Sequence, residues 1–417
     1  MNNYCIAVIG LGYVGWPLAQ ELGKYFPTIG FDTDTEKIQR LSERLATVYD
    51  NNHLTAGLSL AISVQDIADC NVFIVAVPTP VTAETPNLAY LLDATKMIAR
   101  VLKNNDLVIY ESTVYPGATE EICIPALETG SRLKLSKDFR VGYTPERINP
   151  GADDHKLTNT KKVIAGSCTK AIEQIDNIYS KIVIAGLHKV SSIKVAEATK
   201  ILENVQRDVN IALINECADI FGRLNIDIEE VLKAAETKWN FASYRPGLVG
   251  GHCIGVDTYY LAHRAKRAGC MPELVLAARR VNEEVPTRLA QKLIAQMIKL
   301  DAKIRNAKVL IMGLTFKENC EDLRNSKTVN LIQALERYGM EIDVYDPIAD
   351  PAQAKLQHGI ELVTEPRQDT YDVLIIAVAH RNFRDMGDQR IRRLGKKAAI
   401  LFDLKYVFDE KSSDLRF

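Results

Sequence analysis

The feature that most constrains the fold is a strand that runs into closely spaced glycines near the amino terminus. From Cys5 the chain reads Cys-Ile-Ala-Val-Ile-Gly-Leu-Gly-Tyr-Val-Gly, with Gly10, Gly12 and Gly15 in the spacing G-x-G-x-x-G. A helical stretch follows, and then a second apolar strand that ends at Asp32. Alone the glycine spacing is a weak signal, but this order of strand, helix and acid-terminated strand is typical of a dinucleotide-binding βαβ unit. The sequence therefore predicts a Rossmann-like domain at this end of the chain.

The same unit predicts how a dinucleotide is held. Glycines let the pyrophosphate approach the backbone, and the helix amino terminus around Tyr13 and Val14 supplies N–H groups and a favourable dipole. Asp32 is placed to bind ribose hydroxyls, and its charge favours NAD over NADP because a carboxylate repels a 2′-phosphate. Lys37 lies near enough in the sequence to weaken that preference. We therefore expect NAD as the cofactor.

Length and composition limit the class of protein. A chain of 417 residues exceeds one ordinary core, so two or three domains are expected. A composition of 47% hydrophobic and 25% charged residues is typical of a soluble globular enzyme. The formal net charge of -1, without a long basic run, argues against a nucleic-acid or anionic-membrane partner. No signal peptide or membrane-spanning apolar run is apparent, and the 8 cysteines are scattered singly, which favours a cytoplasmic protein with reduced thiols.

Further apolar strands extend the first domain. Strands over residues 71–77 and 106–110 alternate with helical stretches, which predicts a parallel, doubly wound sheet. Ligands bind beyond the carboxyl ends of the strands of such sheets. The polar residues that follow these strands are Thr79, Glu111, Ser112 and Thr113. We expect them to face cofactor or substrate, although Ser and Thr at strand ends are as often ordinary helix caps.

A loop bounded by proline and glycine follows the next strand. Residues 141–151 read Val-Gly-Tyr-Thr-Pro-Glu-Arg-Ile-Asn-Pro-Gly, which presents Glu146, Arg147 and Asn149. Charged loop residues are usually only solvated, so the loop by itself does not establish a functional site.

The middle of the chain predicts a long amphipathic helix over residues 191–224, with apolar residues recurring at helical spacing. Such a helix between two α/β segments is most simply an interdomain spine, and its exposed face is suited to a second subunit. Lys200 and Asn204 are four residues apart and so share one face of this helix. An ordinary solvated surface is the alternative for this pair.

A third segment begins near residue 307 and contains strands over residues 308–313, 341–346, 371–378 and 399–403. It resembles a second nucleotide-type α/β unit without the full glycine signature. The expected fold is α/β, with two Rossmann-like doubly wound parallel-sheet domains joined by a long central helix. We expect a NAD-binding domain over residues 1–188, a central helical dimerisation domain over 189–300, and a second Rossmann-like domain over 301–417.

One cysteine lies in unusual surroundings. Pro246-Gly-Leu-Val-Gly-Gly-His-Cys-Ile-Gly-Val-Asp257 sets Cys253 among glycines, with a carboxylate four residues further on. Glycines let a thiol be presented at a surface rather than packed in a core. The alternative is that Cys253 is a small buried hydrophobe, which is common for a free cysteine.

Taken together, these motifs resemble the UDP-glucose/GDP-mannose (nucleotide-sugar) 6-dehydrogenase family. The matching pieces, in family order, are Gly10-x-Gly12-x-x-Gly15, Glu111-Ser-Thr-Val-Tyr-Pro-Gly117, Thr144-Pro-Glu146, Lys200 with Asn204, Gly250-Gly-His-Cys253 with Asp257, and Thr315-Phe-Lys317 with Arg324. The sequence around Glu146 and Cys253 is most similar to that of the UDP-N-acetylglucosamine and UDP-N-acetylgalactosamine 6-dehydrogenases of capsular, O-antigen and Vi-type polysaccharide synthesis. UDP-glucose enzymes usually carry a lysine just before the aspartate, where this chain has Val256.

The resemblance implies a four-electron oxidation of the sugar C6 alcohol to a carboxylate, with two NAD reduced in turn. Cys253 is then the nucleophile that forms a thiohemiacetal and a thioester. Lys200 is the candidate for stabilising oxyanions at C6, with Asn204 beside it. Asp257 and Glu146 are the candidates for proton transfer and thioester hydrolysis, with a water positioned by Thr113. Which carboxylate is the base in each step stays open.

The resemblance also implies that the domain over residues 301–417 binds the UDP-sugar, and it implies the binding residues. For substrate they are Glu146, Arg147, Asn149, Lys200, Asn204, Arg245, Gly250 and Lys317, with Arg245 reaching across a homodimer interface and Lys317 contacting the diphosphate. For the cofactor they include Thr79, Thr113 and Arg324 beside the glycine turn, Asp32 and Lys37. No metal is expected, because His252 beside Cys253 has no second ligand pair at zinc spacing.

Three alternatives stay open from the sequence. UDP-glucose or UDP-N-acetylmannosamine is an alternative substrate, and the gluco or galacto epimer cannot be read from these motifs. A two-electron hydroxyacid dehydrogenase shares the first domain and a helix lysine but has no use for the thiol. A catalytically silent protein that binds NAD or a nucleotide sugar is the third.

Overall fold

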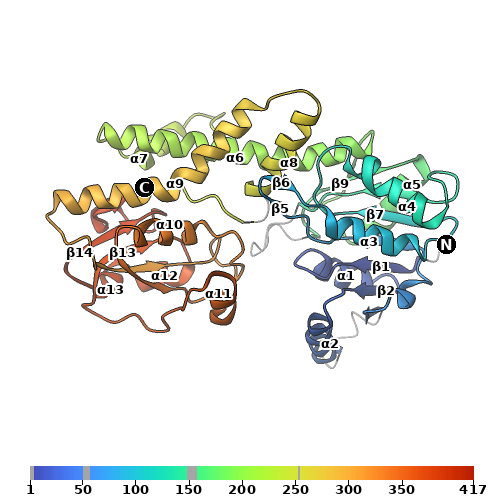
Figure 1. Ribbon diagram of the computed structural model, residues 1–417, viewed down its shortest axis with the longest axis horizontal. Coiled ribbons are helices and arrows are strands. Elements are labelled where there is room, and N and C mark those ends of the chain that lie inside the picture. Colours follow the sequence, from blue (N-terminus) through green and yellow to red (C-terminus); the bar gives the residue numbers. More distant parts are fainter. Residues whose placement is uncertain (1–3, 50–56, 148–156, 252–253) are drawn as a thin grey trace. The chain divides into compact units, whose positions relative to one another are not determined.

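The computed structural model describes residues 4–49, 57–147, 157–251 and 254–417. The chain divides into two compact units. The first comprises Met1–Glu203 with Tyr259–Met271, and the second comprises Asn204–Thr258 with Pro272–Phe417. Each unit contains its own sheet, coloured blue to green and orange to red respectively in Figure 1.

The first unit is built on an eight-stranded sheet with the order β10-β9-β8-β7-β4-β1-β2-β3. The strands are β1 (Ile6–Ile9), β2 (Thr28–Phe31), β3 (Leu58–Ala61), β4 (Val72–Val75), β7 (Leu107–Tyr110), β8 (Arg140–Tyr143), β9 (Lys162–Gly166) and β10 (Leu187–Lys189). Neighbouring strands are parallel except for β8 and β9, which are antiparallel. The central strands β1, β4 and β7 are apolar and buried throughout, as expected for strands covered on both faces.

Further helices and one short hairpin belong to the first unit. They are α1 (Gly15–Gly23), α2 (Thr35–Tyr49), α3 (Ala89–Ala99), α4 (Ile124–Ser131), α5 (Thr169–Tyr179) and the hairpin β5 (Val81–Thr82) with β6 (Thr85–Pro86). Helix α5 packs on β8 and β9, while α1 packs on β1, β2 and β3. Apolar residues of α1 and α5, such as Leu18 and Ile175, enter the same core as Ile6 and Val8 of β1. The predicted doubly wound domain is thus confirmed, with one antiparallel pairing that the sequence pattern did not indicate.

The expected long helix is α6 (Ile193–Arg223), whose 31 residues lie within the predicted range of 191–224. It is followed by α7 (Ile228–Ala235), α8 (Ile254–Arg267) and α9 (Glu273–Lys299). Helix α9, with 27 residues, was not predicted. It contains Pro286, a residue that usually ends or kinks a helix because it lacks the backbone N–H.

The second unit contains a five-stranded parallel sheet with the order β12-β11-β13-β14-β15. Its elements are β11 (Lys308–Met312), α10 (Lys327–Glu336), β12 (Glu341–Tyr345), α11 (Pro351–His358), β13 (Tyr371–Ile376), α12 (Arg381–Met386), α13 (Asp388–Arg392), β14 (Gly395–Asp403) and β15 (Leu415–Arg416). Leu289 and Leu293 of α9 share one core with Val309 and Ile311 of β11. The second predicted nucleotide-type unit is therefore present.

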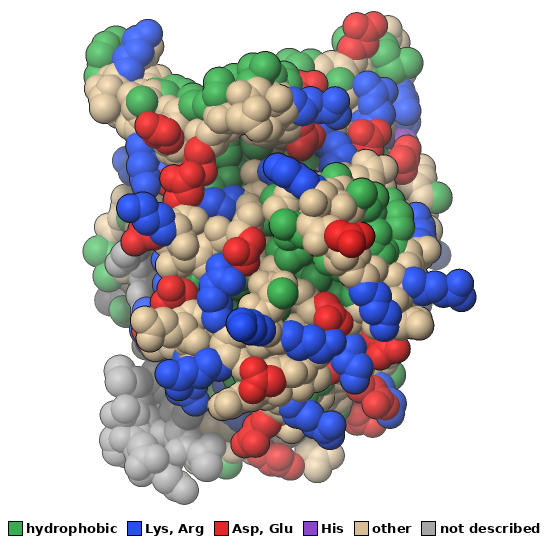
Figure 2. Space-filling view, turned by 90° about the vertical axis from the view of Figure 1, so that its left-hand side faces the viewer, with side chains coloured by type: hydrophobic (Ala, Val, Ile, Leu, Met, Phe, Trp, Pro, Cys, Tyr) green, Lys and Arg blue, Asp and Glu red, His purple; other side chains and the backbone are tan. Residues whose placement is uncertain are grey.

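Charged side chains of both signs lie on the face drawn in Figure 2. On the face shown in Figure 2, basic and acidic side chains are interspersed rather than gathered into regions of one sign, in keeping with a net charge of -1. No helix within the described ranges is long and apolar enough to cross a membrane.

Candidate active site

The glycine turn between β1 and α1 fits a dinucleotide pyrophosphate. Gly10 has a φ of +91°, and a Cβ there would lie 2.9 Å from the Ala76 carbonyl oxygen. A Cβ on Gly15 would lie 1.9 Å from the Gly10 carbonyl oxygen, so neither position accepts a side chain. A Cβ on Gly12 would meet nothing within 4 Å, so the space beside that backbone is open. Two glycines thus shape the turn, while the third leaves room for a phosphate.

Asp32 lies directly after β2 and is held as an anion. One carboxylate oxygen accepts hydrogen bonds from the Leu11 N–H at 2.9 Å and from Lys37 Nζ at 2.8 Å, and the other accepts from the Asp34 N–H at 3.0 Å. Burial raises the pKa of Asp32, but these donors outweigh burial and lower the pKa below its usual value. The geometry fits a carboxylate that receives ribose hydroxyls, with Lys37 partly offsetting its charge.

The carboxyl ends of β4 and β7 are joined by hydrogen bonds. The Thr79 hydroxyl donates to the Thr113 carbonyl at 2.7 Å, and the Tyr260 hydroxyl donates to the Thr79 carbonyl at 2.9 Å. Thr79 and Thr113, predicted from separate strands, are therefore neighbours. Ser112 is buried and donates to the Val77 carbonyl at 2.7 Å, which is a structural contact.

Glu146 and Glu111 belong to one cluster around a buried lysine. Lys162, the first residue of β9, lies with its Nζ 3.2 Å from Glu111 Oε1 and 3.6 Å from Glu146 Oε2. The Tyr179 hydroxyl of α5 donates to Glu111. The Glu111 side chain is 0% exposed, so the expectation that it faces cofactor or substrate is wrong. Beside the cluster, Arg147 pairs with Glu203 at 2.6 Å.

Asn204 and Asp257 are brought together in the second unit. Asn204 Nδ2 of α6 donates to Asp257 Oδ2 of α8 at 2.5 Å, and Asp257 is 1% exposed. Lys200, one turn before Asn204 on α6, is 8% exposed, and its ammonium has no hydrogen bond or ion pair within the described part of the chain. A buried ammonium is costly without a counter-ion, so Lys200 is suited to receive a developing oxyanion from a ligand.

A buried ion pair supports the start of α8. Asp208, one turn beyond Asn204, accepts from Arg279 Nη1 of α9 at 2.7 Å and from the Thr258 hydroxyl at 3.0 Å. The side chains of Asp208 and Arg279 are 0% and 2% exposed. Thr258 follows Asp257, so this pair fixes the backbone that carries the Asp257 carboxylate.

Gly250 and Gly251, which precede the candidate nucleophile Cys253 in the sequence, pack against loop residues that follow β11 in the second unit. The Gly251 N–H donates to the Asn325 carbonyl at 3.2 Å, and Gly251 has a φ of +82° with the Phe316 ring 2.7 Å from where a Cβ would lie. A Cβ on Gly250 would lie 2.4 Å from the Asn325 carbonyl oxygen. Lys317 follows Phe316, so Gly250 and Lys317 lie on segments that pack together. Cys253, His252 and Asn149 lie outside the described residues.

Two predicted arginines are paired within the second unit. Arg245 contacts Glu229 at 2.9 Å and Glu236 at 2.5 Å, and Arg324 contacts Asp322 at 2.7 Å. Their side chains are 37% and 45% exposed. The predicted contacts of Arg245 with substrate and of Arg324 with cofactor stay predictions.

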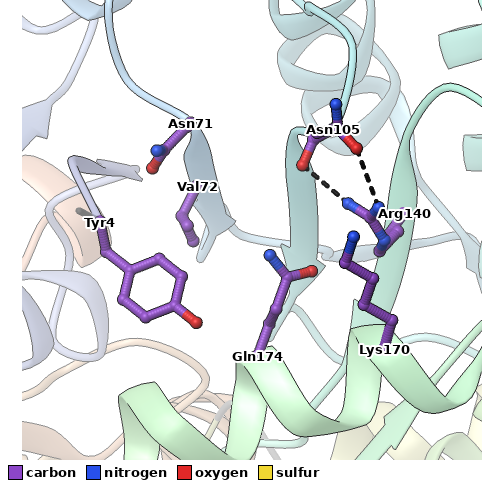
Figure 3. Close-up of a pocket in the computed structure, with 7 residues that line it drawn as sticks. All are labelled: Tyr4, Asn71, Val72, Asn105, Arg140, Lys170 and Gln174. Atoms are coloured by element: carbon purple, nitrogen blue, oxygen red, sulfur yellow. Dashed lines mark hydrogen bonds between the residues drawn. The ribbon is translucent and has the colours of Figure 1, made fainter. Parts of the chain in front are cut away.

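A cavity of about 220 Å³ lies in the first unit, at the ends of the strands opposite to the glycine turn (Figure 3). Its lining residues are Tyr4, Asn71, Val72, Asn105, Arg140, Lys170 and Gln174. Val72 and Arg140 begin β4 and β8, so the cavity is at the amino ends of these strands. Cofactors of doubly wound sheets bind at the carboxyl ends, so this cavity is not the predicted cofactor site. No group of three or more potential metal ligands occurs in the ranges that the structure describes.

Lys162 and Arg279 were missed in the sequence. Lys162 stands at the start of the apolar run Lys-Val-Ile-Ala-Gly, where a lysine usually marks an exposed strand end. Arg279 stands in a charged helical segment with Arg280 and Glu283, and nothing local distinguishes the buried arginine from its exposed neighbours. Only the partners supplied by distant segments identify these two residues.

Comparison with known proteins gives a consistent result over the whole chain. Three models of the UDP-glucose/GDP-mannose dehydrogenase family match in order: the NAD-binding domain over residues 4–183, the central domain over 194–284, and the UDP-binding domain over 310–410.

Among similar proteins is the UDP-N-acetyl-D-glucosamine 6-dehydrogenase of Pseudomonas aeruginosa, 50% identical over 100% of both chains. The Salmonella typhi enzyme of the same name is 47% identical over 99% of this chain and 98% of its own. Among solved structures, the UDP-D-ManNAc dehydrogenase from Pyrococcus horikoshii has a TM-score of 0.87 and 29% identity, covering 97% of this chain and 96% of its own.

Proposed function

Because this chain belongs to the UDP-glucose/GDP-mannose dehydrogenase family, we propose that it oxidises the C6 alcohol of a UDP-N-acetylhexosamine to the carboxylate. The chain is an NAD-dependent dehydrogenase, and its glycine turn and Asp32 fit that cofactor. The observation that carries the choice of substrate is the 50% identity, over the full length of both chains, to a UDP-N-acetyl-D-glucosamine 6-dehydrogenase. UDP-N-acetylgalactosamine is the second candidate, because it differs only in the configuration at C4.

The proposed chemistry proceeds in four steps at C6. The alcohol loses a proton and a hydride to give an aldehyde, and the Cys253 thiolate adds to that aldehyde to form a thiohemiacetal. Loss of a second proton and hydride gives a thioester, and water releases the carboxylate and regenerates the thiol. NAD, when bound, accepts one hydride in each oxidation.

The surroundings of Lys200 and Asn204 support the roles proposed for them. Lys200 stabilises the oxyanion at C6, because its buried ammonium lacks a counter-ion in the described part of the chain. Asn204 donates to Asp257, which orients that carboxylate for proton transfer. Glu146 is the candidate base for the water that cleaves the thioester, and Thr113 positions this water.

The other expected contacts are part of the same proposal. They are Arg147, Asn149, Arg245, Gly250 and Lys317 for substrate, and Tyr13, Val14, Lys37, Thr79 and Arg324 for cofactor. We also propose domain boundaries near residues 188 and 300, and a cytoplasmic homodimer that supplies a uronic acid for surface polysaccharide. In such a dimer Arg245 exchanges Glu229 and Glu236 for a ligand anion.

The substrate is tested by NADH formation with four UDP-sugars. We expect kcat/KM for UDP-N-acetylglucosamine or UDP-N-acetylgalactosamine to exceed that for UDP-glucose at least about tenfold, because a pocket built for an acetamide loses its contacts with a hydroxyl. UDP-N-acetylmannosamine, with the opposite configuration at C2, should react more slowly than the better of the two. A preference for UDP-glucose would contradict the proposal, and no NADH from any of the four would favour a silent binding protein.

A further inference from the structure

A buried lysine of the first unit forms ion pairs with two glutamates at once. Lys162 is 3% exposed, and its Nζ lies 3.2 Å from Glu111 Oε1, 3.6 Å from Glu146 Oε2 and 5.3 Å from the centre of the Tyr179 ring. It also donates to the Pro145 carbonyl at 3.5 Å. One ammonium therefore faces two carboxylates, one of which belongs to the candidate base.

The two carboxylates differ in their surroundings. Glu111 is 0% exposed, and its Oε2 has no hydrogen-bond partner within the described ranges. Its charge therefore depends on Lys162 and on the hydroxyl of Tyr179. The Glu146 side chain is 11% exposed and lies on the loop after β8. Solvent therefore has no access to the Glu111 side chain, whereas a small part of the Glu146 side chain is exposed.

The charges of the cluster are interdependent. Burial raises the pKa of Glu111, Lys162 lowers it and the Glu146 carboxylate raises it, with a raised pKa as the result. Burial alone would lower the pKa of Lys162, but the two carboxylates outweigh burial and raise it, which keeps the ammonium charged. A change of charge at one glutamate therefore changes the electrostatic environment of the other, because both carboxylates contact the same lysine.

We propose that Lys162 and Glu111 are positioning residues for Glu146: Lys162 holds the Glu146 carboxylate in place, and Glu111, the nearer partner of the same ammonium, limits that effect. The inference rests on the proposed role of Glu146 as the base for thioester hydrolysis. The charged and titratable groups near Glu146 include Lys162 from β9, Glu111 after β7, Tyr179 from α5, and Arg147 with its partner Glu203 of α6. Neither positioning residue needs to touch substrate.

The proposal predicts opposite effects of two substitutions on the pH dependence of kcat. Lys162→Met removes a cation 3.6 Å from Glu146, so the acidic limb of the profile should move to higher pH by at least about one unit. Glu111→Gln weakens the nearer partner of the same ammonium and leaves that cation to Glu146, so the acidic limb should move to lower pH. A merely structural role would not move the limb in opposite directions.

The experiment compares pH profiles of NADH formation for wild type, Lys162→Met, Lys162→Arg, Glu111→Gln and Lys161→Met. Lys161 is the matched control, because it is the preceding residue and its side chain is exposed. We expect Lys162→Met to lower kcat at neutral pH roughly tenfold to 100-fold with KM within about threefold, since a misplaced base acts in the chemical step. Lys162→Arg, which keeps the cation, should restore most of the rate, and Lys161→Met should match wild type.

The outcomes separate this inference from the proposed function. If wild type is active and the acidic limb of the kcat profile is unshifted in both Lys162→Met and Glu111→Gln, the inference is overturned and the proposed function stands. Equal losses of kcat in Lys162→Met and Lys162→Arg would have the same meaning. A wild type that forms no NADH from any UDP-sugar would overturn both. If Lys162→Met does not fold, the direction of the limb in Glu111→Gln and the rate of Lys162→Arg decide.

Discussion

Replacing Cys253 with alanine is expected to lower the rate of UDP-uronic acid formation by at least about 10³-fold, because the second oxidation has no route without the thiol adduct. The first oxidation, from alcohol to aldehyde, does not use the thiol. The variant should therefore form at most one NADH per sugar and leave an aldehyde that a hydrazide reagent traps. Mass spectrometry of the trapped product checks this directly.

Cys270 provides the control for that substitution. It is an exposed cysteine of the described chain and has no part in the proposed mechanism, so Cys270→Ala should keep the wild-type rate and product. A Cys253→Ala variant that turns over like wild type would instead support a two-electron hydroxyacid dehydrogenase. That result would remove the main reason for assigning a carboxylate product.

Arg279→Met is expected to destabilise the second unit by about 3–5 kcal/mol, because it leaves the Asp208 carboxylate buried without its cation. Burial already raises the pKa of Asp208, and Arg279 opposes that rise. The melting temperature should fall by roughly 6–20 °C for a unit of this size. Activity should fall as well, because Thr258, which is bonded to Asp208, adjoins the proposed catalytic Asp257.

The matched control is Arg280→Met, since Arg280 is the next residue and is exposed. A change within about 0.5 kcal/mol is expected there. The double variant Asp208→Asn/Arg279→Met should recover part of the lost stability, because no buried charge is then left alone. If Arg279→Met melts at the same temperature as Arg280→Met, the pair does not support the unit as we infer.

The parts of the fold that depend on local geometry could be predicted. Gly10 and Gly15 lie where no side chain fits, and the strands predicted from apolar runs in both sheets end within two residues of the observed strands. Helix α6 followed from its periodicity. Helix α9 did not, because Pro286 conflicts with the usual signal for a continuous helix, and the antiparallel pairing of β8 with β9 depends on how the chain returns to the sheet.

Some contacts of the candidate site join residues that the sequence predicted, and others depend on distant segments of the chain. Asn204 and Asp257 were predicted separately and are in contact, and Thr79 is bonded to Thr113. Lys162 and Glu111 were not assigned to Glu146, because their burial is decided by strands and a helix from other parts of the chain. The role of Cys253 comes from the resemblance and the glycines around it, and stays a prediction.

The most direct test of the central claim, a four-electron oxidation at C6, is the number of NADH formed for each UDP-N-acetylglucosamine or UDP-N-acetylgalactosamine consumed by the wild-type protein. Two NADH for each sugar, with a UDP-uronic acid as product, is the predicted result. One NADH for each sugar, with an aldehyde or ketone as product, would contradict the thioester route and the role proposed for Cys253.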